Sequence, residues 1–369
     1  MKSAKMAGLS WFSFGRALQN ERPTRSAFHA SILIREIQVG PKVGMRTNWF
    51  RGRLVRTCRF RLRFMLGMAV AAVAISTVSA QQNPNADGTP VHMVVTVEPH
   101  HGSDVATVTR DDVMVYEGKE RDQVLDWVPA QGDHAGLELF ILIDDSSSQS
   151  VDTQISDIKK FIAAQPATAK IGVAYMQNGT ARIEQNLTDN HDLAAKAIRL
   201  PVGYFGADAS PYFSLSDLAK HWQQDGTRHE VLMVTNGFDP YYETGDMLDP
   251  YLAAAIEDCQ KTGILPSAIY APSAGHVGHS YWLNYWGQIY LAKLAEETGG
   301  EAYYIGFNGP AVDFTPYLKD LAARLNHQYL LTFAAKPKKK PGLQHVKLRT
   351  ELHNVDLVSA DAVYVPASE

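Results

Sequence analysis

The sequence predicts a doubly wound α/β domain, in which helices cover both faces of a mostly parallel six-stranded sheet. Near-continuous apolar runs at residues 137–143, 170–176 and 230–235 have the pattern of strands buried on both faces. Stretches in which apolar residues recur at helical spacing separate these runs. The first run ends in carboxylates and hydroxyls, and open α/β sheets bind ligands at the carboxyl ends of their strands.

Residues 1–80 differ in composition from the rest of the 369-residue chain. They hold 14 of the 35 Lys and Arg residues and 2 of the 39 Asp and Glu residues, which leaves 21 basic and 37 acidic residues after position 80. The basic block ends in a short apolar run and Val78-Ser79-Ala80, which predicts a secretory signal cleaved after Ala80. The alternative is that this segment is an uncleaved membrane anchor. A translation start at Met45 or later is also consistent with a signal peptide.

The mature chain is therefore expected to be secreted or periplasmic, with no membrane span after cleavage. Its acidic balance disfavours nucleic acid as a partner. Cys259 is the one cysteine after residue 80, so the sequence predicts neither an intramolecular disulfide nor a cysteine-based zinc site there.

Residues 81–134 are predicted to form an N-terminal β segment. A polar linker precedes a Val- and Thr-rich strand over 91–98, and a hairpin-like pattern follows over 113–127. Residues 327–369 are predicted to form a C-terminal β extension, with strand-like stretches over 329–333, 346–349 and 362–365. Neither piece is large enough to form a core alone, so we expect the two to pack together as a small β module.

Residues 135–326 are predicted to form the α/β domain itself. Asp152 and Asp249 are candidate helix caps, Pro250 suits a first helical position, and Gly299 ends a helix. After the first strand, the elements expected in order are a helix from Asp152, strands over 170–176 and 181–187 (the latter at the sheet edge), helices over 192–200 and 214–223, a strand over 230–235, a helix over 250–262, a strand over 264–271, a helix around 282–298, a strand over 301–305 and a helix over 315–325.

Three side chains after the first strand point to a cation site. Asp144, Ser146 and Ser148 alternate along the chain, so a tight loop can direct all three at one point. One carboxylate with two hydroxyls is hard oxygen ligation, which suits Mg²⁺, Mn²⁺ or Ca²⁺ and not zinc.

This Asp-x-Ser-x-Ser loop resembles the metal-ion-dependent adhesion site (MIDAS) of von Willebrand factor A (VWFA) domains. The lead-in strands and the tail resemble a secreted bacterial, acidobacterial-type family of VWFA-related proteins, so the resemblance covers residues 91–366. It implies a Rossmann-like fold and a divalent cation, Mg²⁺ before Mn²⁺ or Ca²⁺. It also implies ligands from a second and a third loop, and an open metal position that takes an acidic residue from a protein partner.

The second and third loops depart from the family pattern. Ser210 stands in the role of the family's Thr, with Asp208 nearby as a further carboxylate. The third loop has Asn236 where the family has Asp, and Asp239 follows close by. Losing one charge predicts weak metal binding, because affinity for hard cations rises with the number of charged ligands. The alternative is a metal-free domain whose loop hydroxyls cap the following helix.

Further candidates for partner binding follow other strands. His276, His279, Tyr241, Tyr242 and Trp282 are expected at the same edge of the sheet as Asp208. Aromatic side chains at a rim suit protein recognition, although a plain surface loop explains the same residues.

The function predicted from these features is non-covalent, metal-dependent recognition of a protein partner, and not catalysis. No Gly-x-Ser-x-Gly elbow or Gly-x-Gly-x-x-Gly loop follows a strand. A metal-dependent hydrolase, with His276 or His279 beside an activated water, and a metal-free scaffold domain are the alternatives.

Overall fold

The structure is a computed structural model. Asp208, His276 and the predicted leader over 1–80 lie outside the residues that it describes. The described residues are 88–100, 105–203, 210–223, 227–242, 245–246, 248–274, 278–307, 309 and 311–367.

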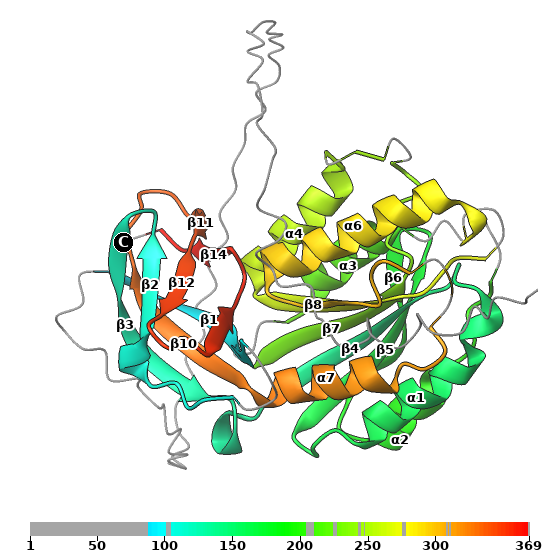
Figure 1. The fold of residues 1–369 in the computed structure, drawn as a ribbon, viewed down its shortest axis with the longest axis horizontal. Coiled ribbons are helices and arrows are strands. Elements are labelled where there is room, and N and C mark those ends of the chain that lie inside the picture. Colours follow the sequence, from blue (N-terminus) through cyan, green and yellow to red (C-terminus); the bar gives the residue numbers. More distant parts are fainter. Residues whose placement is uncertain are drawn as a thin grey trace, which may run out of the picture. The chain divides into compact units, whose positions relative to one another are not determined.

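One six-stranded sheet has the order β6-β5-β4-β7-β8-β9 (Figure 1). Its strands pair in parallel, except that the edge strand β6 runs antiparallel to β5. With β4 counted as the first strand, this is the doubly wound order 3-2-1-4-5-6. The predicted mostly parallel sheet is therefore present. The strands are β4 (Leu137–Asp144), β5 (Ala169–Gln177), β6 (Thr180–Thr188), β7 (Arg228–Thr235), β8 (Ile264–Tyr270) and β9 (Ala302–Tyr303).

Helices cover both faces of this sheet, as Figure 1 shows. Alternate residues of β4 explain why its sequence is apolar from Leu139 to Ile143: Leu139 and Ile141 pack under α1, α2 and α7, whereas Phe140 and Leu142 pack under α3, α4 and α6. The helices are α1 (Asp152–Ala163), α2 (His191–Ala197), α3 (Pro211–His221), α4 (Pro250–Thr262), α6 (Tyr281–Thr298) and α7 (Thr315–Asn326), with short 3-10 turns η2 (Arg110–Asp112), η3 (Gly132–His134) and η4 (Gln149–Val151).

A second six-stranded sheet, with the order β12-β2-β3-β10-β1-β13, is antiparallel throughout, so the parallel arrangement does not extend to it. It is larger than the small module expected, because it includes the short strand β13, whose sequence gave no clear alternating pattern. Strand β10 lies between β1 and β3, which joins the two ends of the described chain in one sheet. The strands are β1 (Thr89–Pro99), β2 (Val113–Glu117), β3 (Glu120–Pro129), β10 (Gln328–Ala335), β12 (Lys347–Thr350) and β13 (Val355–Val358), and a separate pair is formed by β11 (Gly342–His345) and β14 (Ala362–Val365).

The predicted helix caps have different outcomes. Asp249 caps α4 as expected, since its carboxylate accepts hydrogen bonds from the Tyr251 and Leu252 amides. The prediction for Asp152 is wrong, because Asp152 is the first residue of α1 and Ser148 caps the turn η4 before it. None of the helices in the described part of the chain combines the length and hydropathy needed to cross a membrane.

Candidate binding site at the carboxyl edge of the sheet

Asp144 is the last residue of β4, and its buried carboxylate is held by hydroxyl groups. Oδ1 accepts hydrogen bonds from the Ser146 amide at 2.9 Å and the Ser146 hydroxyl at 2.7 Å. Oδ2 accepts from the Thr235 hydroxyl at 2.8 Å. Burial raises the pKa of Asp144, and these hydrogen bonds offset part of the rise. The carboxylate thus joins the ends of the neighbouring strands β4 and β7.

The network continues to the end of β8 through Ser273. The Ser273 hydroxyl lies 3.5 Å from the Ser146 hydroxyl and accepts a hydrogen bond from Asn236 Nδ2 at 2.6 Å. The Asn236 side-chain oxygen accepts from the Phe238 amide at 3.0 Å. The structure therefore links Asp144, Ser146 and Asn236, but Asn236 presents its nitrogen to this network and uses its oxygen locally.

Ser210 and Asp239 form a separate buried pair. The Ser210 hydroxyl donates to Asp239 Oδ2 at 2.6 Å, and the Tyr241 amide donates to Oδ1 at 2.8 Å. Ser210 also caps α3 by accepting from the Phe213 amide. Burial raises the pKa of Asp239 to about 6. The six residues predicted as metal ligands thus fall into more than one hydrogen-bonded group.

Ser148 belongs to a pocket beside the network. Its hydroxyl accepts a hydrogen bond from the Ser150 amide at 3.3 Å. The pocket has a volume of about 510 Å³, and Ser273 connects it to the Asn236 hydrogen bond. Its lining is hydroxyl-rich and carries one imidazole: Ser148, Gln149, Ser150, Val202, Gly203, Pro272, Ser273, Ala274, Gly278 and His279.

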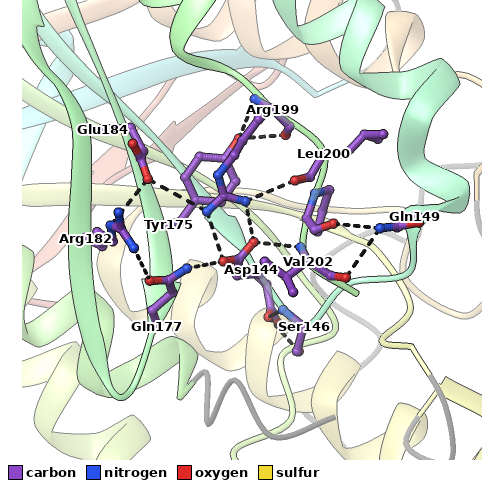
Figure 2. A network of polar contacts seen from close by, with 12 residues as sticks. Asp144, Ser146, Gln149, Tyr175, Gln177, Arg182, Glu184, Arg199, Leu200 and Val202 are labelled. Atoms are coloured by element: carbon purple, nitrogen blue, oxygen red, sulfur yellow. Dashed lines mark hydrogen bonds and ion pairs between the residues drawn. The ribbon is translucent and has the colours of Figure 1, made fainter. Parts of the chain in front are cut away.

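Asp145 points away from Asp144, as alternation along an extended chain requires. Its buried carboxylate forms a bidentate ion pair with Arg199, at 2.6 and 3.0 Å, and also accepts from Gln177 and the Val202 amide. Figure 2 labels these three partners, Arg199, Gln177 and Val202. The guanidinium carbon lies 3.8 Å from the centre of the Tyr175 ring. Burial alone would raise the pKa of Asp145, but the Arg199 and Gln177 hydrogen bonds hold it below its ordinary value.

The donor set does not fit a tightly held divalent cation. Asp144 is the one carboxylate in the network, and both of its oxygens already accept hydrogen bonds. Hard cations bind more tightly as charged oxygen ligands are added. Within the ranges described above, no three His, Cys, Asp or Glu side chains are grouped as a metal site. A weakly held cation at Asp144, Ser146 and Ser148 stays a prediction.

The predicted rim residues are placed on two segments. Tyr241 and Tyr242 follow β7, and Trp282 lies in the first turn of α6 with an exposed side chain. His279 lines the pocket.

Sequence reasoning did not assign roles to Thr235, Ser273 and Arg199. Thr235 and Ser273 were detectable, because they are hydroxyl residues at or just after the ends of strands β7 and β8. Arg199 lies 54 residues from Asp145 in a loop, and no local pattern links the two.

Comparisons with known proteins give similarity to solved structures alone. No family model matches the sequence, and no curated protein matches it. An aerotolerance-related membrane protein of Bacteroides fragilis is 14% identical, covers 52% of this chain and 99% of its own, and has a TM-score of 0.39. The SpRpn10 VWA domain is 13% identical, covers 50% of this chain and 94% of its own, and has a TM-score of 0.34.

The ArnB paralog VWA2 of Sulfolobus acidocaldarius is 8% identical, covers 75% of this chain and 76% of its own, and has a TM-score of 0.32. The TM-scores of all three are below 0.5, so these likenesses carry no argument about the site. The resemblance to von Willebrand A domains continues to rest on the loop of Asp144, the lead-in strands and the tail.

Proposed function

We propose that this protein is a secreted or periplasmic binding module that recognises a protein partner at the carboxyl edge of its α/β sheet. One observation supports the proposal most strongly. The ends of three neighbouring strands are joined by Asp144, Asn236 and Ser273 beside a hydroxyl-lined pocket of about 510 Å³. A fixed polar network next to a concavity suits recognition, because its groups need no reorganisation when a partner binds.

The partner predicted for this pocket supplies an acidic side chain. Hydroxyls of Ser148 and Ser150 and the imidazole of His279 can each donate a hydrogen bond to a carboxylate. A divalent cation at Asp144 would add attraction for the same carboxylate when bound. Recognition of an acidic residue is thus compatible with both the metal-dependent and the metal-free form of the site.

A photo-crosslinking side chain at Ser150, in the exposed wall of the pocket, tests the proposal. We expect the full chain to crosslink a partner peptide from position 150 in material secreted by the source organism. A matched control carries the same side chain at Ser156, which is exposed on α1 outside the pocket. Equal crosslinking from both positions would show that this edge does not recognise the partner. Repeating the experiment with a chelator separates the metal-dependent form from the metal-free form.

The alternative of a metal-dependent hydrolase has one described residue in its favour, because His279, predicted to lie beside an activated water, lines the pocket. Hydrolysis needs a general base within hydrogen-bond reach of an attacking water. The Asp144 oxygens are occupied by Ser146 and Thr235, so Asp144 does not present a free base to the pocket.

A further inference from the structure

The first turns of α6 expose three large aromatic side chains. Tyr281, Trp282 and Tyr285 are 69%, 45% and 51% exposed. No charged residue occurs from Tyr281 to Leu291, so the amino-terminal part of α6 is an uncharged aromatic surface. Exposed aromatic residues gathered on one helix often mark an interaction site. We call Tyr281, Trp282 and Tyr285 the aromatic face.

The loop between β7 and α4 places a carboxylate beside the aromatic face. Gly245 has φ +60°, and an added Cβ there would lie 2.3 Å from a Trp282 ring atom and 2.7 Å from a Trp286 ring atom. The loop backbone therefore packs directly on these two indoles. Tyr290 donates a hydrogen bond to the Asp246 carbonyl at 2.8 Å. Tyr242 donates to the Asp246 carboxylate at 3.1 Å. Asp246 is thus held next to Trp282 by contacts to both its backbone and its side chain.

The same loop is strongly acidic. Residues 236–250 contain four Asp and Glu residues and no Lys, Arg or His. Two of the acids, Asp239 and Asp249, are buried, and burial raises the pKa of both. The positive charge of Lys293 offsets part of the rise in the pKa of Asp249. Carboxylates close to low-dielectric aromatic side chains produce a concentrated negative potential, which attracts positive groups.

We propose that the aromatic face, together with Asp246, binds an arginine or lysine side chain of the protein partner. The cation would lie over the Trp282 ring and be drawn to the Asp246 carboxylate. Arginine suits the site better than lysine, because its planar guanidinium stacks on aromatic rings and forms bidentate hydrogen bonds with carboxylates. This inference rests on the proposed function, since it assigns a second recognition element to the same edge. A partner would then present an acidic residue to the pocket and a basic residue to Trp282.

Two short peptides test the inference on the full chain. One is acetyl-Gly-Arg-Gly-Arg-Gly-amide, and the other has Glu in place of each Arg. We expect the Arg peptide to bind and quench tryptophan fluorescence, and the Glu peptide not to bind. A Lys version should bind a few-fold more weakly than the Arg peptide. Raising the salt concentration from about 0.05 to 0.5 M should weaken binding several-fold, because charge attraction is screened.

Single substitutions locate the binding site. Trp282→Ala should weaken binding of the Arg peptide at least about tenfold, and Asp246→Asn about fivefold. Asparagine keeps an acceptor for Tyr242, so the loop should stay folded. Tyr285→Ala gives a second test if Trp282→Ala disturbs α6. Tyr364→Ala is the matched control, because Tyr364 is also an exposed aromatic residue, at 40%, but lies on β14.

Equal binding of the Arg and Glu peptides, or undiminished binding by both Trp282→Ala and Tyr285→Ala, would overturn the inference. Its failure is distinguishable from failure of the proposed function. A protein that crosslinks from position 150 but ignores the Arg peptide keeps the proposed function and loses the basic contact. A protein that binds the Arg peptide at Trp282 but does not crosslink from position 150 keeps the basic contact and loses the proposed recognition at the pocket.

Discussion

Asp144 and Asp145 are consecutive buried carboxylates with opposite environments. Asp145 is neutralised by a bidentate ion pair with Arg199, and its pKa is lowered. Asp144 has hydroxyl and amide donors alone, and its pKa is raised. The same strand end therefore holds one carboxylate that is neutralised by a cation and one that is held by neutral donors alone. Because Asp145 already has a cation as its partner, Asp144 is the carboxylate that the proposed recognition at this edge would use.

The largest effect is expected from removing the cation on the Asp145 side. Arg199→Ala leaves the Asp145 charge buried without its partner and should lower the free energy of unfolding by about 2–3 kcal/mol. The loss is below the 3–5 kcal/mol typical of fully buried pairs because Arg199 is 36% exposed. Chemical denaturation measures the change. Lys261→Ala is the control, since Lys261 forms an exposed ion pair with Glu257 outside this network and should cost less than about 1 kcal/mol. Equal losses would remove the distinction between the two carboxylates.

The stability cost of Arg199→Ala should depend on pH. The pKa of Asp145 is lowered in the folded wild type, so its ion pair contributes stability above the ordinary pKa of about 4. That contribution is lost as the pH falls through the folded-state pKa. The difference between wild type and Arg199→Ala should therefore be full at pH 7 and shrink toward pH 3. Denaturation at a series of pH values measures it, and a constant difference would mean that Arg199 acts by packing on Tyr175 and not by charge.

How far the sequence predicted this arrangement depends on the distance between interacting residues. The β4 strand followed from its apolar run, which lies within one local stretch of sequence. The placement of Thr235 beside Asp144 was not predicted, because it depends on β7 lying next to β4 in the sheet. Arg199 was not predictable, because side-chain reach across a loop decides its contact. The pairing of β10 with β1 and β3 also depends on long-range contacts, which no sequence window contains.

A smaller effect is expected on the Asp144 side. Asp144→Asn keeps an oxygen for the Ser146 donors and a group that can hydrogen-bond the Thr235 hydroxyl, so its cost at pH 4 should stay within about 1 kcal/mol. The folded-state pKa of Asp144 is raised, so wild-type stability from this group is present below pH 4 and lost as the pH rises through that pKa. The free energy of unfolding of Asp144→Asn, relative to that of the wild type, should therefore rise between pH 4 and pH 7 in the same denaturation series. If the variant instead becomes less stable relative to the wild type as the pH rises, the Asp144 charge stabilises the fold.

The substitution that changes the structure least tests directly whether the site binds a cation. In Asn236→Asp, one oxygen keeps the hydrogen bond from the Phe238 amide, and the other replaces Nδ2, 2.6 Å from the Ser273 hydroxyl. That hydroxyl lies 3.5 Å from Ser146, so the substitution places a second carboxylate beside the Asp144 network. Each added charged ligand tightens binding of hard cations, and we expect roughly a tenfold gain in Mg²⁺ or Mn²⁺ affinity by calorimetry.

Two further variants make the calorimetric result specific. Asn190→Asp adds the same charge at the cap of α2, where Asp is an equally good cap, and should leave cation affinity unchanged. Asp144→Ala should abolish cation binding in the wild-type and the Asn236→Asp backgrounds, because it removes the carboxylate on which the loop depends. If neither the wild type nor Asn236→Asp takes up a cation, the hydroxyls of the Asp144 loop act without metal. Recognition at this edge would then depend on the pocket and on the charge beside Trp282.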